Sequence, residues 1–116
     1  MSKVTQWQEL LPTLRDRYIG GDIEEHSHPE GIFRGPISDI KIEGDTLTIS
    51  SPWCAHFEGE GWVKWHITSG GYSLEYCTAP QDIGNDRLMF SSTPFSRIVL
   101  FPKDGSKLDP KKVRNL

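Results

Sequence analysis

The chain has 116 residues, with 13 Lys or Arg against 16 Asp or Glu and 35% hydrophobic residues. This length and composition are typical of one soluble domain that buries a single core without disulfides or metals. No apolar run approaches the roughly 20 residues of a membrane span, and the first residues lack the apolar segment of a signal peptide. We therefore expect a cytoplasmic protein that does not enter a membrane.

Residues 5–18 show helical spacing. The apolar positions that fall on one face are Val4, Trp7, Leu10, Leu11, Leu14 and Tyr18. Thr5 followed by Gln8 matches a capping box, and Gly20-Gly21 ends the pattern. Pro12 predicts either a kink or a break into two short helices, because proline lacks an amide hydrogen and clashes with the preceding turn.

The alternation of apolar residues changes to a period of two after Pro36. A two-residue turn at Gly44-Asp45 would pair Ile42 with Leu47 and Ile40 with Ile49 on one face. A second turn at Gly70-Gly71 would pair Ile67 with Leu74 and Trp65 with Tyr76, which places Trp65 in the core.

The stretch SPWCAHFEGEGWVKWH, residues 51–66, allows two registers. A three-residue Gly-Glu-Gly turn with a bulge pairs Phe57 with Val63 and Ala55 with Trp65, and we favour it because it buries the larger apolar set. A two-residue Gly59-Glu60 turn would instead place Cys54 and His56 opposite Trp65 and Val63.

These patterns predict an α+β fold in which an N-terminal kinked helix packs on an antiparallel sheet of about six strands. The sheet would form a roll or a small half-open barrel, too small to hold a ligand, so its own side chains should fill the interior. We expect one domain over residues 1–116, made of a helical segment 5–18, a linker 20–35, a β-sheet region 36–102 and a basic C-terminal tail 103–116.

The favoured register leaves a polar face with a mixture of aromatic, basic, acidic and thiol side chains. Its members are Cys54, His56, Trp62, Lys64, His66, Glu75 and Cys77, and Tyr72 lies at an edge. An exposed tryptophan among such groups is typical of a protein interface, so the expected binding residues are Trp62, Lys64, His66, Glu75 and Tyr72. The N-terminal helix could equally cover this face.

The same face is a poor enzyme site. The two cysteines would lie about two strand spacings apart, too far for one zinc ion or a disulfide, so we expect free thiols. His66 beside Glu75 and Cys54 has the residue types of a thiol nucleophile, yet a flat strand face supplies no enclosed pocket. We assign no catalytic residue and no cofactor, and whether the protein is an enzyme stays open, with a non-catalytic role favoured.

The segment GGDIEEHSHPEG holds two histidines among acidic residues. The spacing Gly20-x5-His26-x-His28 resembles the beginning of a cupin metal motif, but Ile32 and Phe33 stand where that motif continues with a glutamate. The resemblance covers nine residues and implies a metal site at His26 and His28, to which His56 or His66 could add a further ligand. We favour the other interpretation, an acidic linker exposed to solvent between the helix and the sheet.

The main hypothesis is therefore a non-catalytic domain that binds a protein partner or a second copy of itself as a homodimer. The alternatives are a metal-dependent, cupin-like enzyme or metal-binding protein using His26 and His28, and weak nucleic-acid binding through Trp62, Lys64 and the basic residues 111–114. Nucleic acid is the less favoured partner, since the chain outside its basic end is acidic and would repel a polyanion.

Overall fold

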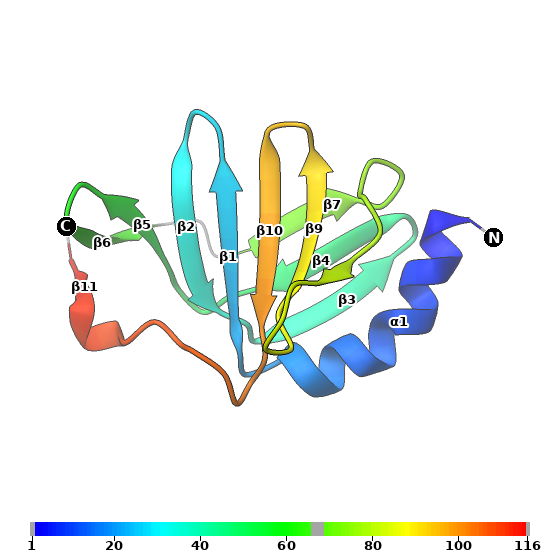
Figure 1. Ribbon diagram of the computed structural model, residues 1–116, viewed down its shortest axis with the longest axis horizontal. Helices are drawn as coiled ribbons and strands as arrows, with labels where there is room; N and C mark the ends of the chain where they lie inside the picture. Colours follow the sequence, from blue (N-terminus) through cyan, green and yellow to red (C-terminus); the bar gives the residue numbers. More distant parts are fainter. Residues whose placement is uncertain (1, 66–68, 116) are drawn as a thin grey trace.

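The computed structural model describes residues 2–65 and 69–115. One helix precedes a series of strands and a short 3-10 turn near the end of the chain (Figure 1). The elements are α1 (Lys3–Tyr18), β1 (Asp22–Ser27), β2 (Gly31–Pro36), β3 (Asp39–Glu43), β4 (Thr46–Ser50), β5 (Cys54–Glu58), β6 (Gly61–Trp65), β7 (Ser69–Ser73), β8 (Gln81–Asp82), β9 (Leu88–Thr93), β10 (Ser96–Phe101), η1 (Pro110–Lys112) and β11 (Val113–Arg114).

The strands form two open sheets. Within the described residues, an eight-stranded sheet has the order β11-β6-β5-β2-β1-β10-β9-β8, and a three-stranded sheet has the order β3-β4-β7. All neighbours are antiparallel except β11 and β6. The α+β class and the antiparallel pairing are confirmed, but the sheet is larger than six strands and does not close into a barrel.

The segment 20–35, which the sequence suggested is a linker, supplies two central strands. Residues of β1 pair with β2 on one side and with β10 on the other. Its inner face, turned toward the small sheet, carries Ile23 and Glu25, whereas Asp22, Glu24 and His26 lie on the outer face. Acidic residues on both faces hide the alternation that usually identifies a strand.

Helix α1 covers the small sheet and one end of the large sheet (Figure 1). Trp7, Leu14 and Tyr18 are buried in the main core, as the helical spacing predicted, whereas Leu10 is 39% exposed. The ring of Trp7 meets Phe90 edge to face at 5.0 Å. The helix therefore does not cover the strand that carries Trp62.

The start of α1 differs from expectation, and its middle excludes one of the two alternatives expected at Pro12. Ser2, not Thr5, is the N-cap, and its hydroxyl accepts a hydrogen bond from the Thr5 amide at 3.2 Å. Pro12 lies inside one uninterrupted helix rather than between two short ones. Both Pro12 and Gln8, whose carbonyl loses its usual partner, are exposed, so water can hydrate that carbonyl.

The Gly44-Asp45 hairpin has the predicted register. Ile40 pairs with Ile49 and Ile42 with Leu47. Gly44 has a φ of +62°, a conformation that this tight turn requires and glycine adopts without strain. The buried residues of β3 and β4 then form the floor on which the helix packs.

The Gly70-Gly71 turn does not form. Both glycines lie within β7, where Gly70 pairs with Ile49 and Gly71 with Thr48. The chain passes from one sheet to the other between Trp65 and β7, so Trp65 and Tyr76 are not partners, and Tyr76 is 69% exposed. The expected partner residue Ile67 lies outside the described residues.

The favoured register of the β5–β6 hairpin is also wrong. The two-residue turn forms instead, with Gly59 at a φ of +61°, and it pairs Cys54 with Trp65 and His56 with Val63. Our choice assumed that only one face of this hairpin is buried. In fact Val63 and Ala55 are both buried, on opposite faces, because the C-terminal segment covers the outer one.

The basic end of the chain is not a free tail. Asp22, only 2% exposed, accepts hydrogen bonds from Arg34 Nε at 2.9 Å and from the Leu108 amide at 2.7 Å. Arg34 Nη2 also donates to the Ser106 carbonyl at 2.9 Å. Residues 103–115 therefore cross the outer face of the large sheet and end as β11 beside β6.

Candidate ligand site between the two sheets

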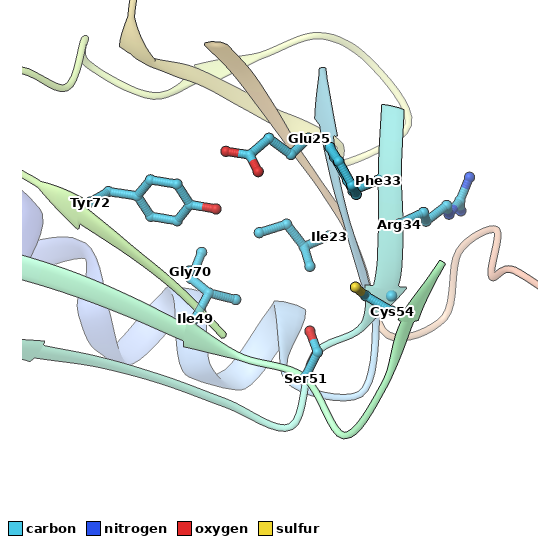
Figure 2. A pocket seen from close by; sticks show the side chains of 10 residues that line it. Ile23, Glu25, Phe33, Arg34, Ile49, Ser51, Cys54, Gly70 and Tyr72 are labelled. Carbon is cyan, nitrogen blue, oxygen red and sulfur yellow. The ribbon is translucent and has the colours of Figure 1, made fainter. Parts of the chain in front are cut away.

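A cavity lies where the inner face of the large sheet meets the small sheet (Figure 2). Its volume is about 100 Å³, and several of its lining residues are partly exposed, so it is open to solvent. The lining consists of Ile23, Glu25, Phe33, Arg34, Gly35, Ile49, Ser51, Cys54, Gly70 and Tyr72. Sequence reasoning expected a filled interior, but the two sheets diverge here instead of closing.

Two polar groups from opposite sheets project into this mostly apolar space. Figure 2 shows the Glu25 carboxyl, from β1, and the Tyr72 hydroxyl, from β7, pointing toward one another. Among the residues that the structure describes, neither group has a hydrogen-bond partner, and every fully buried polar side-chain atom does have one. Both groups can therefore be reached from the cavity.

Burial perturbs the titratable groups around this space. The pKa of Glu25 is raised from its ordinary value of 4.5 by burial and, to a lesser extent, by the negative charge of Glu30. Burial, followed by the charge of Glu25, raises the pKa of both Tyr72 and Cys54. The tyrosine and the cysteine are therefore neutral at physiological pH, and Glu25 carries the only negative charge among the described lining groups.

The single basic residue in the lining does not neutralise Glu25. The Arg34 side chain extends away from the cavity, toward the outer face (Figure 2). There its guanidinium is paired with Asp22 at 2.9 Å and with Glu24 at 3.2 Å, and it stacks 4.1 Å from the centre of the Phe101 ring. The cavity consequently has a negative potential when Glu25 is ionised.

Two glycines keep the cavity walls in place. A Cβ at Gly35 would lie 2.4 Å from the Trp53 carbonyl oxygen, which shows how closely β2 approaches the chain before β5. A Cβ at Gly70 would lie 2.5 Å from the Tyr72 hydroxyl oxygen, so the Tyr72 ring occupies the space that a side chain at position 70 would need. Of the glycine pair that we interpreted as a turn, Gly70 is thus needed for the position of Tyr72.

An aromatic cluster continues from the cavity toward β6. The ring of Phe33 stacks on His56 with centroids 4.6 Å apart and meets Trp65 at 5.9 Å. The His56 ring is fixed by its Nε2 atom, 2.9 Å from the Glu30 carbonyl, and by its Nδ1 atom, 3.2 Å from Glu58. Phe33 is therefore supported by His56 and Trp65, which are not among the residues that line the cavity.

The structure does not bring the five expected binding residues together. Tyr72 lines the cavity, whereas Trp62 and Lys64 lie on the outer face of β6, where Trp62 packs on Phe57 at 5.2 Å. Glu75 is exposed, and its carbonyl accepts a hydrogen bond from Lys3 Nζ at 3.1 Å. His66 lies outside the described residues.

The three histidines proposed for a metal are also separated. His26 lies on the outer face with its Nε2 atom 2.5 Å from Glu24, whereas His56 lies on the inner face. His28 follows β1, and its amide donates to the Phe95 carbonyl at 2.9 Å. Over residues 2–65 and 69–115, no group of three or more His, Cys, Asp or Glu side chains is placed to hold a metal ion.

Sequence reasoning missed Glu25 as a site residue. Its signal is an acidic residue at an inward position, two residues after Ile23, once DIEEHS is recognised as a strand.

Comparison with protein-family models, with curated proteins and with solved structures found no match to this chain. In the described part of the chain, no helix is long and apolar enough to cross a membrane.

Proposed function

We propose that this protein binds a small ligand in the cavity between its two sheets. The observation that carries this proposal is the approach of Glu25 and Tyr72 from opposite sheets into an apolar cavity, where neither polar group has a hydrogen-bond partner among the described residues. A concave apolar site with a few convergent polar groups is the usual form of a small-molecule site.

The volume limits the ligand to a small molecule or to one end of a longer molecule. An engineered cavity of roughly 150 Å³ accommodates benzene, and drug-sized sites begin near roughly 300 Å³. At about 100 Å³, open on one side, this cavity suits a single ring or a short chain with one polar group.

Binding rather than catalysis is favoured by the state of the lining groups. A nucleophilic cysteine acts as its thiolate, and burial together with the charge of Glu25 raises the pKa of the Cys54 thiol. The same two causes keep the Tyr72 phenol protonated. Both groups are therefore suited to hydrogen bonding and packing.

Adjacent glycines in β7 provide a matched test of the site. Gly70→Ala adds a methyl group at the cavity lining and displaces the Tyr72 ring, whereas a Cβ at Gly71 would meet only Thr46 Cγ2 at 3.7 Å. Benzyl alcohol, titrated while amide NMR shifts are followed, should bind the wild type and Gly71→Ala at millimolar levels and bind Gly70→Ala at least about threefold more weakly. Equal affinity of benzyl alcohol for both variants would show that it binds outside this cavity.

Self-association is a second candidate function. Tyr76 and Phe95 are each 69% exposed, and Tyr76 lines a surface groove together with Thr93 and Pro94. Large exposed aromatic side chains of this kind are enriched in interfaces. Sedimentation of the wild type and of a Tyr76→Ser, Phe95→Ser double variant tests this: a dimer that the double variant abolishes supports it, and a monomeric wild type refutes it.

A further inference from the structure

We infer that the ligand of the inter-sheet cavity is a small primary amine, bound as its ammonium cation by the Glu25 carboxylate and the Tyr72 hydroxyl oxygen. This inference rests on the proposed function and adds the chemical class of the ligand. The charge of the site, its hydrogen-bond acceptors and its aromatic walls all favour such a ligand.

The charge of the cavity excludes anionic ligands and favours cationic ones. Glu25 is the ionisable acid that projects into the cavity, and Glu30 lies close enough to raise its pKa further. The guanidinium of Arg34 is held on the other face of the sheet by Asp22 and Glu24. An anionic ligand would therefore meet negative charge that no described residue compensates, whereas a cation would supply the partner that Glu25 lacks among those residues.

The acceptors match an ammonium group. A primary ammonium has three N–H donors and no acceptor. Glu25 can accept one or two of these, Tyr72 Oη has free lone pairs, and Ser51 contributes a hydroxyl to the same lining (Figure 2). A hydrogen bond from a cation to a carboxylate is also about twice as strong as one between neutral groups.

Aromatic rings complete the site. Phe33 and Tyr72 line the cavity from opposite sheets, and the Phe33 ring also packs on His56 and Trp65. The face of an aromatic ring attracts a cation, and its apolar surface packs against the carbon body of the ligand. Ile23 and Ile49 supply the remaining apolar contacts.

The position of Glu25 supports the same conclusion. Its cross-strand neighbours are Ile98, which is fully buried, and Phe33, so the carboxylate is placed among apolar groups where its ionisation is unfavourable. Unpaired acids at such positions are uncommon because burying a charge is costly. A bound cation removes that cost, which couples occupancy of the cavity to the ionisation of Glu25.

Three probes of nearly equal shape and different charge test this inference. Benzylamine, benzyl alcohol and benzoate are titrated at neutral pH into the wild type, Glu25→Gln and Glu60→Gln. Glu25→Gln keeps the shape of the side chain, and Glu60→Gln makes the same change of net charge in the exposed β5–β6 turn. Binding is followed by the amide shifts of cavity residues such as Gly70 and by calorimetry, and the folding of each variant by circular dichroism.

We expect benzylamine to bind the wild type and Glu60→Gln at least about tenfold more tightly than benzyl alcohol does, and benzoate not to bind. Glu25→Gln should remove the preference for benzylamine and leave the affinity for benzyl alcohol within about threefold. Equal affinities of the amine and the alcohol for the wild type, or tighter binding of benzoate, would overturn the amine assignment and leave the cavity as a ligand site. Failure of all three probes to shift cavity residues would overturn the proposed function as well.

Discussion

The buried carboxylate of Asp22 joins the C-terminal segment to the large sheet, and its removal is the sharpest test of the fold. Asp22→Asn keeps the size of the side chain and removes its charge. Arg34 Nε at 2.9 Å and the Leu108 amide at 2.7 Å both donate to Oδ2 of Asp22, and the neutral amide oxygen of asparagine accepts these hydrogen bonds more weakly than a carboxylate. Breaking one partner of a buried ion pair costs about 3–5 kcal/mol in general.

The other contacts of Arg34 reduce the cost expected for Asp22→Asn. Arg34 keeps Glu24 at 3.2 Å, the Ser106 carbonyl at 2.9 Å and its stacking on Phe101, so its charge is not left without partners. We therefore expect the free energy of unfolding to fall by about 2–3 kcal/mol, a large part of the roughly 5–15 kcal/mol available to a domain of this size.

Urea unfolding followed by tryptophan fluorescence measures this loss. Asp16→Asn is the control, since the Asp16 side chain is 88% exposed and lies 3.9 Å from Lys103, and it should change stability by less than about 0.5 kcal/mol. Hydrogen exchange at the Leu108 amide should accelerate in Asp22→Asn before global unfolding. A loss below about 0.5 kcal/mol, with unchanged exchange at Leu108, would refute the idea that Asp22 anchors this segment.

Three further predictions follow from burial and charge. Trp7 is 1% exposed, so Trp7→Ala should lower the free energy of unfolding in urea by about 3–5 kcal/mol. Trp65 is half-buried, so Trp65→Ala should lower it by only about 1–2 kcal/mol. A larger loss for Trp65→Ala than for Trp7→Ala would show that Trp65 is the core residue. The pKa of Glu25 is raised in the folded state, so the contribution of Glu25 to stability falls as pH increases above about 4.5. Glu25→Gln should therefore be more stable than the wild type at pH 7 but not at pH 3. A difference in stability that does not change with pH would contradict this. Burial raises the pKa values of the Cys54 and Cys77 thiols, so both should react slowly in the native protein at neutral pH and titrate in non-reducing denaturant. Finding no thiol after denaturation would refute this.

Local patterns in the sequence were sufficient for elements whose partners are near in the chain. The helix follows from the spacing of Trp7, Leu14 and Tyr18, and the β3–β4 hairpin from agreement between the Gly44-Asp45 turn and the alternation on both sides. In these elements the hydrogen bonds form within about twenty residues and the spacing of apolar residues marks the buried face, so a single local pattern specifies them.

The tertiary structure decided everything that depends on distant partners. Gly70-Gly71 is equally compatible with a turn and with a strand that must make room for a ring, and only pairing with β4 selects the strand. The acidic β1 is a strand because β2 and β10 pair with both of its edges, a fact that its composition conceals. The cavity depends on the separation of two sheets and on the direction of Glu25 and Tyr72, residues 47 positions apart. No local sequence pattern predicts that Glu25 and Tyr72 approach each other, because the packing of its own sheet places each side chain.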